Sequence, residues 1–331
     1  MSVAEAQADS GNLSGAEALA ALRTGGKRAL ARALATAESR PDAPETLALL
    51  DAAQAAPLGH VIGLTGPPGV GKSSLANRLI AAWRARGLSV AVVAVDPSSR
   101  ASGGALLGDR TRLETDPDDA GVFVRSMAAR ERLGGLAALT WPAVALMRAL
   151  FDRVLVETVG VGQSETEVAD LADTVILCVQ PSSGDALQFM KSGVMETPHL
   201  LAVTKSDLGA PARRALADLK GALSLAPPRA DGSEPEALGC SSVTPGGWDA
   251  LIEAVETRIA ALPAAGLARA RALSARTWAE TALREQFGAQ GLAAARAALA
   301  DSGFAAAPFA RVSALRARLA AALDGAFARH S

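Results

Sequence analysis

The chain has few aromatic residues, with four Trp, seven Phe and no Tyr among its 331 residues. Proteins that bind single-stranded nucleic acid rely on aromatic side chains that stack on bases and on a surplus of basic charge. Lysine and arginine total 33, aspartate and glutamate total 34, and the formal net charge is −1. The composition therefore argues against nucleic acid and against an anionic membrane surface as partners.

Cysteine and histidine, which ligate zinc or nickel, are also scarce, with two and three residues respectively. Cys178 and Cys240 lie far apart in apolar stretches, and the histidines are His60, His199 and His330. None of them has the close spacing of a metal-ligand motif. We therefore do not expect a zinc or nickel site formed by this chain alone.

A signal sequence and a membrane-spanning segment are not indicated either. Residues 1–12 carry acidic side chains and no apolar core, unlike a secretory signal. The most apolar long stretch, residues 133–150, is interrupted by glycines, a proline and an arginine, which is typical of a buried helix. We expect a cytoplasmic protein.

Short apolar segments alternate with helical stretches through the middle of the chain. The predicted strands are 60–65, 89–95, 122–124, 153–158, 174–179, 200–203 and 237–240. The predicted helices are 72–86, 133–150, 163–171, 185–195, 211–223 and 248–262. This alternation predicts an α/β fold in which helices flank a mainly parallel sheet.

Strand signals are missing at both ends of the chain. Residues 14–55 show apolar residues at helical spacing with a break at Gly25-Gly26, and residues 264–331 are rich in Ala, Arg and Leu and look wholly helical. We therefore predict an N-terminal helical segment (residues 1–56), an α/β domain (57–262) and a C-terminal helical arm (263–331).

Residues 66–73 match the phosphate-binding loop G-x-x-x-x-G-K-S and lie between a predicted strand and a predicted helix. Glycines let backbone N–H groups approach phosphates, and a helix N-terminus adds positive potential. We expect Lys72 to reach the β- and γ-phosphates and Ser73 to offer its hydroxyl to Mg²⁺. The alternative is a chance Gly-rich turn. The residues predicted to bind nucleotide here are Gly66, Pro67, Pro68, Gly69, Val70, Gly71, Lys72, Ser73 and Ser74.

A predicted buried strand ends in Glu157-Thr158-Val159-Gly160. In P-loop hydrolases an acidic residue at such a strand end helps to hold Mg²⁺, and the glycine N–H contacts the γ-phosphate. The alternative is an exposed acid in a turn. Many small GTPases place a water-orienting Gln directly after that glycine, whereas this chain has Val161, so we expect slow intrinsic hydrolysis. The predicted catalytic residues are Lys72, Glu157, Gly160 and Gln163, and a switch segment or a partner could complete the site.

Thr204-Lys205-Ser206-Asp207 resembles the guanine-specificity motif N/T-K-x-D. The Asp207 carboxylate would accept hydrogen bonds from N1–H and the exocyclic amine of guanine, and adenine offers neither donor at those positions. Lys205 would lie over the base. The alternative is an ordinary turn at a strand end. A second base-contacting loop is predicted at Ser241 and Ser242, through backbone N–H groups, so GTP and GDP are the predicted ligands.

Two further acids could help to hold Mg²⁺. Asp96 ends a predicted strand, and Asp109 lies in Leu-Gly-Asp-Arg. Asp96 could instead cap a helix or form a turn before Pro97, and Asp109 could be a solvated loop acid. The residues alone leave both questions open.

Taken together these strings closely resemble the MeaB/ArgK-type GTPases associated with methylmalonyl-CoA mutase. The resemblance spans roughly residues 20–262 and is carried by residues 25–39 (GGKRALARALATAES), 66–74 (GPPGVGKSS), 95–99 (VDPSS), 107–110 (LGDR), 125–128 (RSMA), 133–136 (LGGL) and 156–165 (VETVGVGQSE). It implies a GTPase sheet with an N-terminal helical piece and a C-terminal arm that forms a homodimer. It also implies a G-protein chaperone that binds an adenosylcobalamin-dependent acyl-CoA mutase, gates cofactor delivery and protects the enzyme.

The resemblance assigns roles to individual residues. Mg²⁺ and phosphate contacts fall on Lys72, Ser73, Asp96, Asp109 and Glu157, and guanine recognition falls on Lys205 and Asp207.

The resemblance also implies a switch segment that signals to the mutase. It runs from Gly184 to Lys191, with Asp185, Gln188 and Lys191 at a spacing of three that is equally typical of a solvated helix face. The chain departs from the family pattern at three positions, which hold Ala186 in place of Glu, Ser192 in place of Lys and Thr204 in place of Asn.

Three other functions deserve comparison with this one. A metal-delivery GTPase of the nickel type would need Cys or His ligands. An ArgK-like, transport-linked ATPase or kinase conflicts with Asp207. A non-hydrolysing scaffold conflicts with intact Lys72, Ser73 and Glu157.

Overall fold

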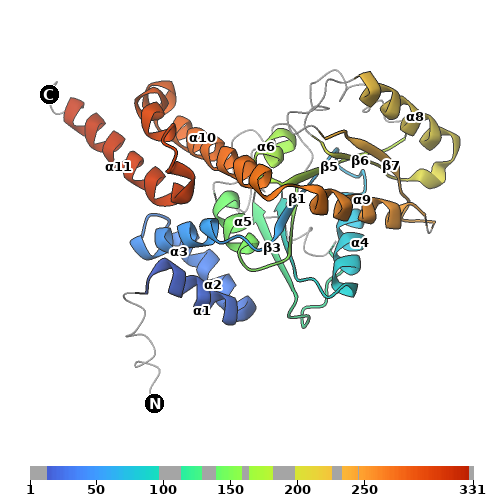
Figure 1. Cartoon of the computed structure of the whole chain (residues 1–331), viewed down its shortest axis with the longest axis horizontal. Helices are drawn as coiled ribbons and strands as arrows, with labels where there is room; N and C mark the ends of the chain where they lie inside the picture. Colours follow the sequence, from blue (N-terminus) through green and yellow to red (C-terminus); the bar gives the residue numbers. More distant parts are fainter. Residues whose placement is uncertain are drawn as a thin grey trace, which may run out of the picture. The chain divides into compact units, whose positions relative to one another are not determined.

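The structure is a computed structural model that describes residues 13–96, 113–128, 139–158, 164–181, 198–225, 233–244 and 246–327. Within these residues one seven-stranded sheet has the order β3-β2-β4-β1-β5-β6-β7. Figure 1 shows β5, β6 and β7 next to one another near α8. All neighbouring strands pair in parallel. The strands are β1 (His60–Thr65), β2 (Val90–Asp96), β3 (Val122–Ala128), β4 (Arg153–Glu157), β5 (Thr174–Val179), β6 (Leu200–Val203) and β7 (Glu236–Gly239). The predicted α/β fold with a parallel sheet is confirmed.

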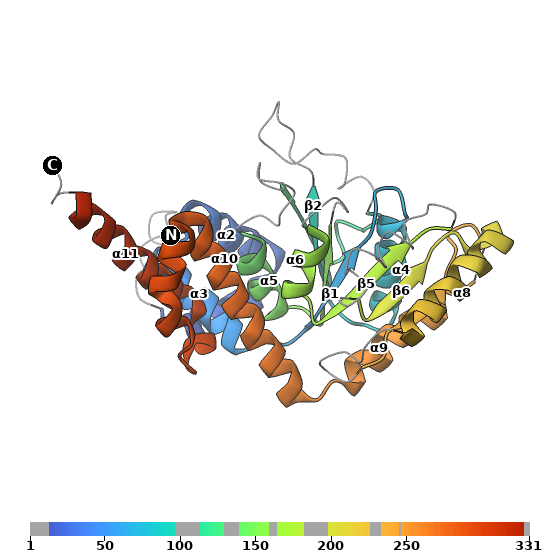
Figure 2. The same cartoon turned by 90° about the horizontal axis from the view of Figure 1, so that it is seen from above.

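Strands β1, β5 and β6 are buried along their whole length because helices cover both faces of the sheet. Every residue of β1, β5 and β6 is buried, which is the reason these strands read as continuous apolar segments. Among the described residues, the helices that pack on this sheet are α4 (Lys72–Ala85), α6 (Ser164–Leu171), α8 (Ala210–Leu225) and α9 (Trp248–Ala261). Figure 2 shows β1, β5 and β6 side by side, with α8 running along this end of the sheet.

Alternate residues of one strand show which helix covers which face. Ile176 of β5 packs in one core with α4 and α9, whereas its neighbour Leu177 packs in a second core with α8. On β1, Gly63 faces α6, because a Cβ on Gly63 would lie 2.6 Å from the Val168 side chain. Helices α4 and α9 therefore cover one face, and α6 and α8 cover the other.

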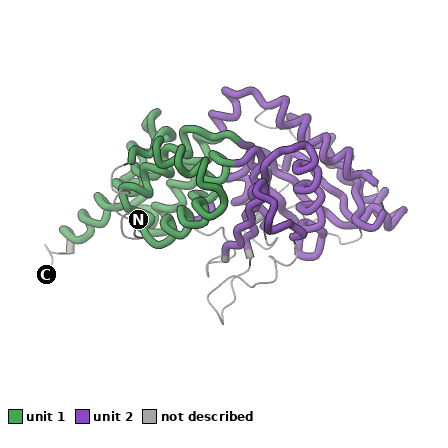
Figure 3. Tube along the Cα trace, turned by 90° about the horizontal axis from the view of Figure 1, so that it is seen from below, with its two compact units in different colours: residues 1–58, 141–150, 271–331 green, residues 59–140, 151–270 purple. Residues whose placement is uncertain are grey.

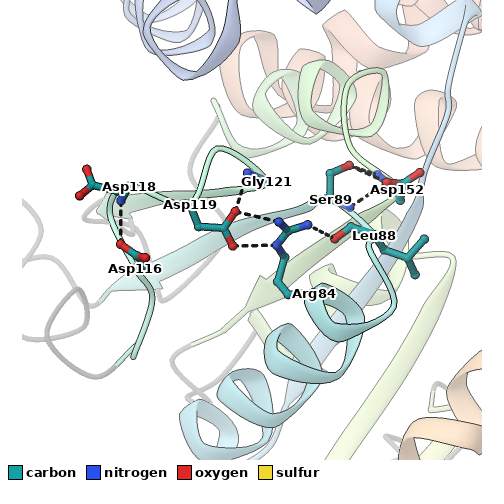
Figure 4. Close-up of polar contacts among 8 residues, drawn as sticks. All are labelled: Arg84, Leu88, Ser89, Asp116, Asp118, Asp119, Gly121 and Asp152. Atoms are coloured by element: carbon teal, nitrogen blue, oxygen red, sulfur yellow. Dashed lines mark hydrogen bonds and ion pairs between the residues drawn. The ribbon is translucent and has the colours of Figure 1, made fainter.

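The amino edge of the sheet is tied by ion pairs and hydrogen bonds (Figure 4). Arg84, in the last turn of α4, makes two 2.8 Å bonds to the Asp119 carboxylate, and its third nitrogen donates to the Leu88 carbonyl at 2.7 Å. Ser89 donates to Asp152 through its backbone N–H and its hydroxyl. Burial disfavours ionised Asp152, yet these bonds hold the pKa of its carboxyl below the usual range. The contacts join the segments that lead into β2, β3 and β4.

The chain divides into two compact units (Figure 3). Unit 2 holds residues 59–140 and 151–270, which include the sheet. Unit 1 holds residues 1–58, 141–150 and 271–331. Its helices are α1 (Gly15–Thr24), α2 (Gly26–Ser39), α3 (Pro44–Ala55), nearly all of α5 (Thr140–Arg148), the larger part of α10 (Ala264–Leu299), a short η4 (Phe304–Ala306) and α11 (Pro308–Phe327). The helical segments predicted at the two ends of the chain thus contribute to one unit.

An aromatic cluster holds unit 1 together. Trp141 of α5 stacks on Trp278 of α10 with ring centroids 4.7 Å apart, and Phe309 of α11 lies 5.1 Å from both. The Asp51 carboxylate of α3 accepts the backbone N–H groups of Phe309 and Ala310, the second and third residues of α11. These contacts bring together segments that are up to 259 residues apart in sequence.

The C-terminal region is helical as predicted over α10 and α11, with breaks that the composition did not reveal. Gly288 has φ 67° and ψ −167° inside α10, a conformation that favours glycine and interrupts the helix. Asp301 lies in the turn before η4, where its carboxylate accepts the Gly303 N–H. The same carboxylate forms an ion pair with Arg311 of α11. The helix predicted at 133–150 is described only over α5, and the one predicted at 185–195 lies outside the described residues. No helix in the described part of the chain is long and apolar enough to cross a membrane.

Candidate nucleotide site

The phosphate-loop motif lies between β1 and α4, at the carboxyl edge of the sheet where open α/β sheets bind ligands. Gly66 and Gly71 have φ angles of 132° and 107°, which side chains rarely adopt. A Cβ on Gly66 would also lie 2.3 Å from the carbonyl oxygen of Cys178 in β5. Glycine is therefore required for the loop to pass this close to the neighbouring strand.

Lys72 is the first residue of α4, and its side chain is buried against the loop. Its Nζ donates to the carbonyl oxygens of Gly66 at 2.7 Å and Pro67 at 3.1 Å. The ammonium therefore lies against the phosphate loop. The motif predicts that the backbone of this loop surrounds phosphates. Its charge adds to the positive end of the α4 dipole at the same place.

Ser73, which follows Lys72 in α4, contacts Glu157 at the end of β4. The Ser73 hydroxyl donates to Glu157 Oε1 at 2.7 Å. The register pairs Glu157 with Leu64 of β1, and the Thr158 N–H donates to the Leu64 carbonyl at 3.1 Å. A hydroxyl and a carboxylate at this distance are oxygen ligands of the kind that Mg²⁺ prefers, so the residues present fit a magnesium ion.

Of the other predicted site residues, Asp96 lies at the same edge of the sheet, and several fall outside the described residues. Asp96 ends β2, which pairs with β4, so its backbone lies at the carboxyl edge of the sheet. The predicted residues that fall outside the described part of the chain are Asp109, Gly160, Gln163, Asp185, Gln188 and Lys191.

The segment after β6 is joined to the phosphate loop through Thr204. This side chain is buried, and its Oγ1 lies 2.6 Å from the Val70 carbonyl and 3.2 Å from the Val179 carbonyl. Thr204 occupies the position where the family has Asn, and its hydroxyl is directed at backbone. It therefore holds the phosphate loop and the predicted base loop together.

The two predicted base loops also touch each other. The Ser241 hydroxyl donates to Asp207 Oδ1 at 2.5 Å and accepts the backbone N–H groups of Val243 and Thr244 at 3.0 Å. The predicted contact between the Ser241 backbone and the base stays a prediction, and the structure adds a bond from the buried Ser241 side chain to Asp207. Ser242 is exposed beside it. The arrangement fixes the direction of the Asp207 carboxylate.

Gln180, the residue after β5, is not among the predicted site residues. Its Oε1 accepts a hydrogen bond from Lys205 Nζ at 2.7 Å. Lys205 has φ 54°, and among the described residues it is the only non-glycine residue with positive φ. No local pattern marks Gln180, because its partner lies 25 residues away.

Both cysteines lie in the core beneath this edge and are buried. Burial raises the pKa of the Cys240 thiol to about 12 and also raises the pKa of Cys178. Both thiols therefore stay protonated near neutral pH and are poor nucleophiles and metal ligands. The described residues contain no group of three or more His, Cys, Asp and Glu side chains placed to hold a metal.

The chain is similar to proteins of one GTPase family. The family model of the methylmalonyl-CoA mutase-associated GTPase MeaB matches residues 30–295. A protein of Pyrococcus horikoshii named as a candidate GTPase is 44% identical over 195 residues, which cover 58% of this chain and 60% of that protein. GTPase ArgK of Escherichia coli is 37% identical over 258 residues, which cover 76% of this chain and 78% of ArgK.

A crystal structure of a LAO/AO transport system kinase aligns with a TM-score of 0.64 and 29% identity, covering 89% of this chain and 96% of that one. It shares the fold over nearly the whole chain, and the family model covers the phosphate loop, Glu157 and the base loops. The chain therefore belongs to the MeaB family of methylmalonyl-CoA mutase-associated GTPases.

Proposed function

We propose that this chain binds GTP at the carboxyl edge of its sheet, hydrolyses it to GDP and phosphate, and acts as a G-protein chaperone of an adenosylcobalamin-dependent acyl-CoA mutase such as methylmalonyl-CoA mutase. The observation that carries the proposal is the 2.7 Å contact between Ser73 and Glu157 beside the buried ammonium of Lys72. It brings the two parts of a P-loop hydrolase site together from separate strand ends.

Each residue has a role in this proposal. Lys72 neutralises charge on the terminal phosphates, and the loop N–H groups bind their oxygens. Ser73 and Glu157 would hold a magnesium ion, with Asp96 and Asp109 as further candidates. Magnesium, when bound, offsets the negative charge of the phosphates.

Two further catalytic residues come from the resemblance. Gly160 would contact the γ-phosphate and Gln163 could help to orient water. Val161 cannot orient water, so turnover by the isolated chain should be slow.

Guanine recognition is assigned to Asp207, which is supported by its bond from Ser241. Because the carboxylate is held in one direction, it can accept both donors on one edge of guanine, and adenine would leave it unpaired. This favours GTP over ATP and separates the proposed function from a transport-linked kinase that uses ATP.

The partner assignment rests on the family, whose name associates it with methylmalonyl-CoA mutase. In this proposal, nucleotide state gates delivery of adenosylcobalamin to the mutase and protects that enzyme. Homodimerisation through residues 263–331 belongs to the same proposal. Two large apolar side chains are exposed there, Leu273 at 62% and Leu323 at 49%, and a second copy could cover them.

A mutase partner should accelerate GTP turnover. Phosphate release by the purified chain with Mg²⁺ should be slow, and saturating methylmalonyl-CoA mutase from the same organism should raise it at least about tenfold, because a partner can supply the missing water-positioning or charge-stabilising group. The Lys72→Ala variant controls for contaminating phosphatase, and ATP replaces GTP in a parallel arm. An unchanged rate with the mutase would contradict the chaperone role, and equal ATP turnover would favour the kinase.

The proposed switch segment can be tested separately. Lys191→Ala should leave GTP affinity of the free protein within about twofold and should remove the mutase-stimulated rate, because a partner-driven change needs contacts that differ between the two states. Titration calorimetry and phosphate release measure the two quantities, and Lys220→Ala on the exposed face of α8 is the matched control. Full stimulation of the Lys191 variant would show that coupling runs elsewhere.

A further inference from the structure

The residue that follows β5 makes a contact that the family motifs do not include. Gln180 Oε1 accepts a hydrogen bond from Lys205 Nζ at 2.7 Å. Gln180 is half-buried and Lys205 is exposed, so the bond forms at the surface of the base loop. We propose that Gln180 is a positioning residue for guanine nucleotide, which acts by holding the Lys205 side chain in place over the base. This inference rests on the proposed function.

The backbone around this pair is already tied together. The Thr204 N–H donates to the Val179 carbonyl at 2.9 Å, and the Thr204 hydroxyl lies 3.2 Å from the same oxygen. Lys205 follows Thr204 and Gln180 follows Val179, and these two residues add a further hydrogen bond between the segments. The last residue of β5 and the residue after it therefore accept hydrogen bonds from the two residues that follow β6.

Both ends of the Lys205 side chain are set by these contacts. At its base, φ is 54°, and the Ser206 N–H, one residue on, donates to the Cys240 carbonyl at 3.0 Å. A non-glycine residue in the left-handed region costs free energy and persists only where its surroundings impose it. At its tip, Gln180 holds the ammonium. The four-carbon stem between them is therefore constrained at both of its ends.

A held stem matters because lysine has a large side-chain entropy. A lysine that must be ordered on nucleotide binding loses that entropy at the moment of binding, and one that is ordered beforehand does not. Gln180 should therefore raise affinity for GDP and GTP alike, without changing the rate of the chemical step. Such an effect lowers the apparent KM and leaves kcat unchanged.

The test uses the full chain and a fluorescent GDP analogue. Gln180→Met keeps the size of the side chain and removes the acceptor, and it should weaken binding about fivefold, mainly through faster dissociation. Gln180→Glu keeps an acceptor for the ammonium and should bind within about twofold of the parent. Gln290→Ala, at an exposed position on α10, is the matched control.

A double-mutant cycle separates positioning from a general structural effect. In a Lys205→Ala background, Gln180→Met should cause no further loss, because the contact is already gone. Additive losses in the double variant, or equal affinity of the parent and Gln180→Met, would overturn the assignment. A parent that binds no guanine nucleotide would overturn the proposed function and this assignment with it, whereas GDP binding that ignores Gln180 overturns this assignment alone.

Discussion

Replacing Lys72 with alanine should abolish tight binding of GTP and leave the fold intact. The ammonium is buried over the phosphate loop and bonded to the Gly66 and Pro67 carbonyls. Charge-assisted hydrogen bonds contribute about 1.5–3 kcal/mol each, and two terminal phosphates would share this cation. We therefore expect at least about a 100-fold loss of GTP affinity, since each 1.4 kcal/mol corresponds to roughly tenfold. Titration calorimetry with GTP and Mg²⁺ measures it.

The control for Lys72→Ala is Lys220→Ala, which removes an exposed lysine from α8. Circular dichroism and the thermal midpoint should be similar for both variants and the parent, because Lys72 lies at the first turn of α4 and the core residues of that helix are unchanged. Undiminished GTP turnover in the Lys72 variant would show that residues 66–73 do not form the phosphate site.

The second large effect is a change of nucleotide preference in Asp207→Asn. The carboxylate accepts from Ser241, which leaves it fixed in direction, and guanine offers it two donors. An Asn side chain would place its N–H donor against the amine of guanine, which is also a donor. Xanthine has an oxygen acceptor at that position. We expect GDP affinity to fall about 100-fold or more and xanthosine diphosphate to become the preferred ligand.

The matched control for this change is Asp218→Asn on the exposed face of α8. Calorimetry with GDP, ADP and xanthosine diphosphate should show guanine preference in the parent and in the control. Equal affinity of the parent for ADP and GDP, or an unchanged GDP affinity in Asp207→Asn, would remove the guanine assignment.

Much of the sheet was predictable because its signals are local. Strand β5 is buried on both faces, and after Thr174 its other residues form one apolar run, Val175 to Val179. The strands predicted at 174–179 and 200–203 coincide with β5 and β6. The phosphate loop is local too, because its glycines and the start of α4 are consecutive in sequence.

The contacts that orient the site were not predictable in the same way. Ser241 meets Asp207 across 34 residues, and Gln180 meets Lys205 across 25. Residue type shows that each side chain can donate or accept, but its partner depends on which strand ends become neighbours. The order β5-β6-β7 decides that.

From the sequence alone follow the fold class, the order of most strands and helices, and the family, because burial periodicity and short motifs act over a few residues. The tertiary structure alone shows that helices from both ends of the chain form one unit around Trp141, Trp278 and Phe309. A helical stripe reveals that a face must be buried, whereas its partner is selected by packing between segments far apart in sequence. For the same reason, only the tertiary structure shows that Ser241 is hydrogen-bonded to Asp207 and that Gln180 is hydrogen-bonded to Lys205.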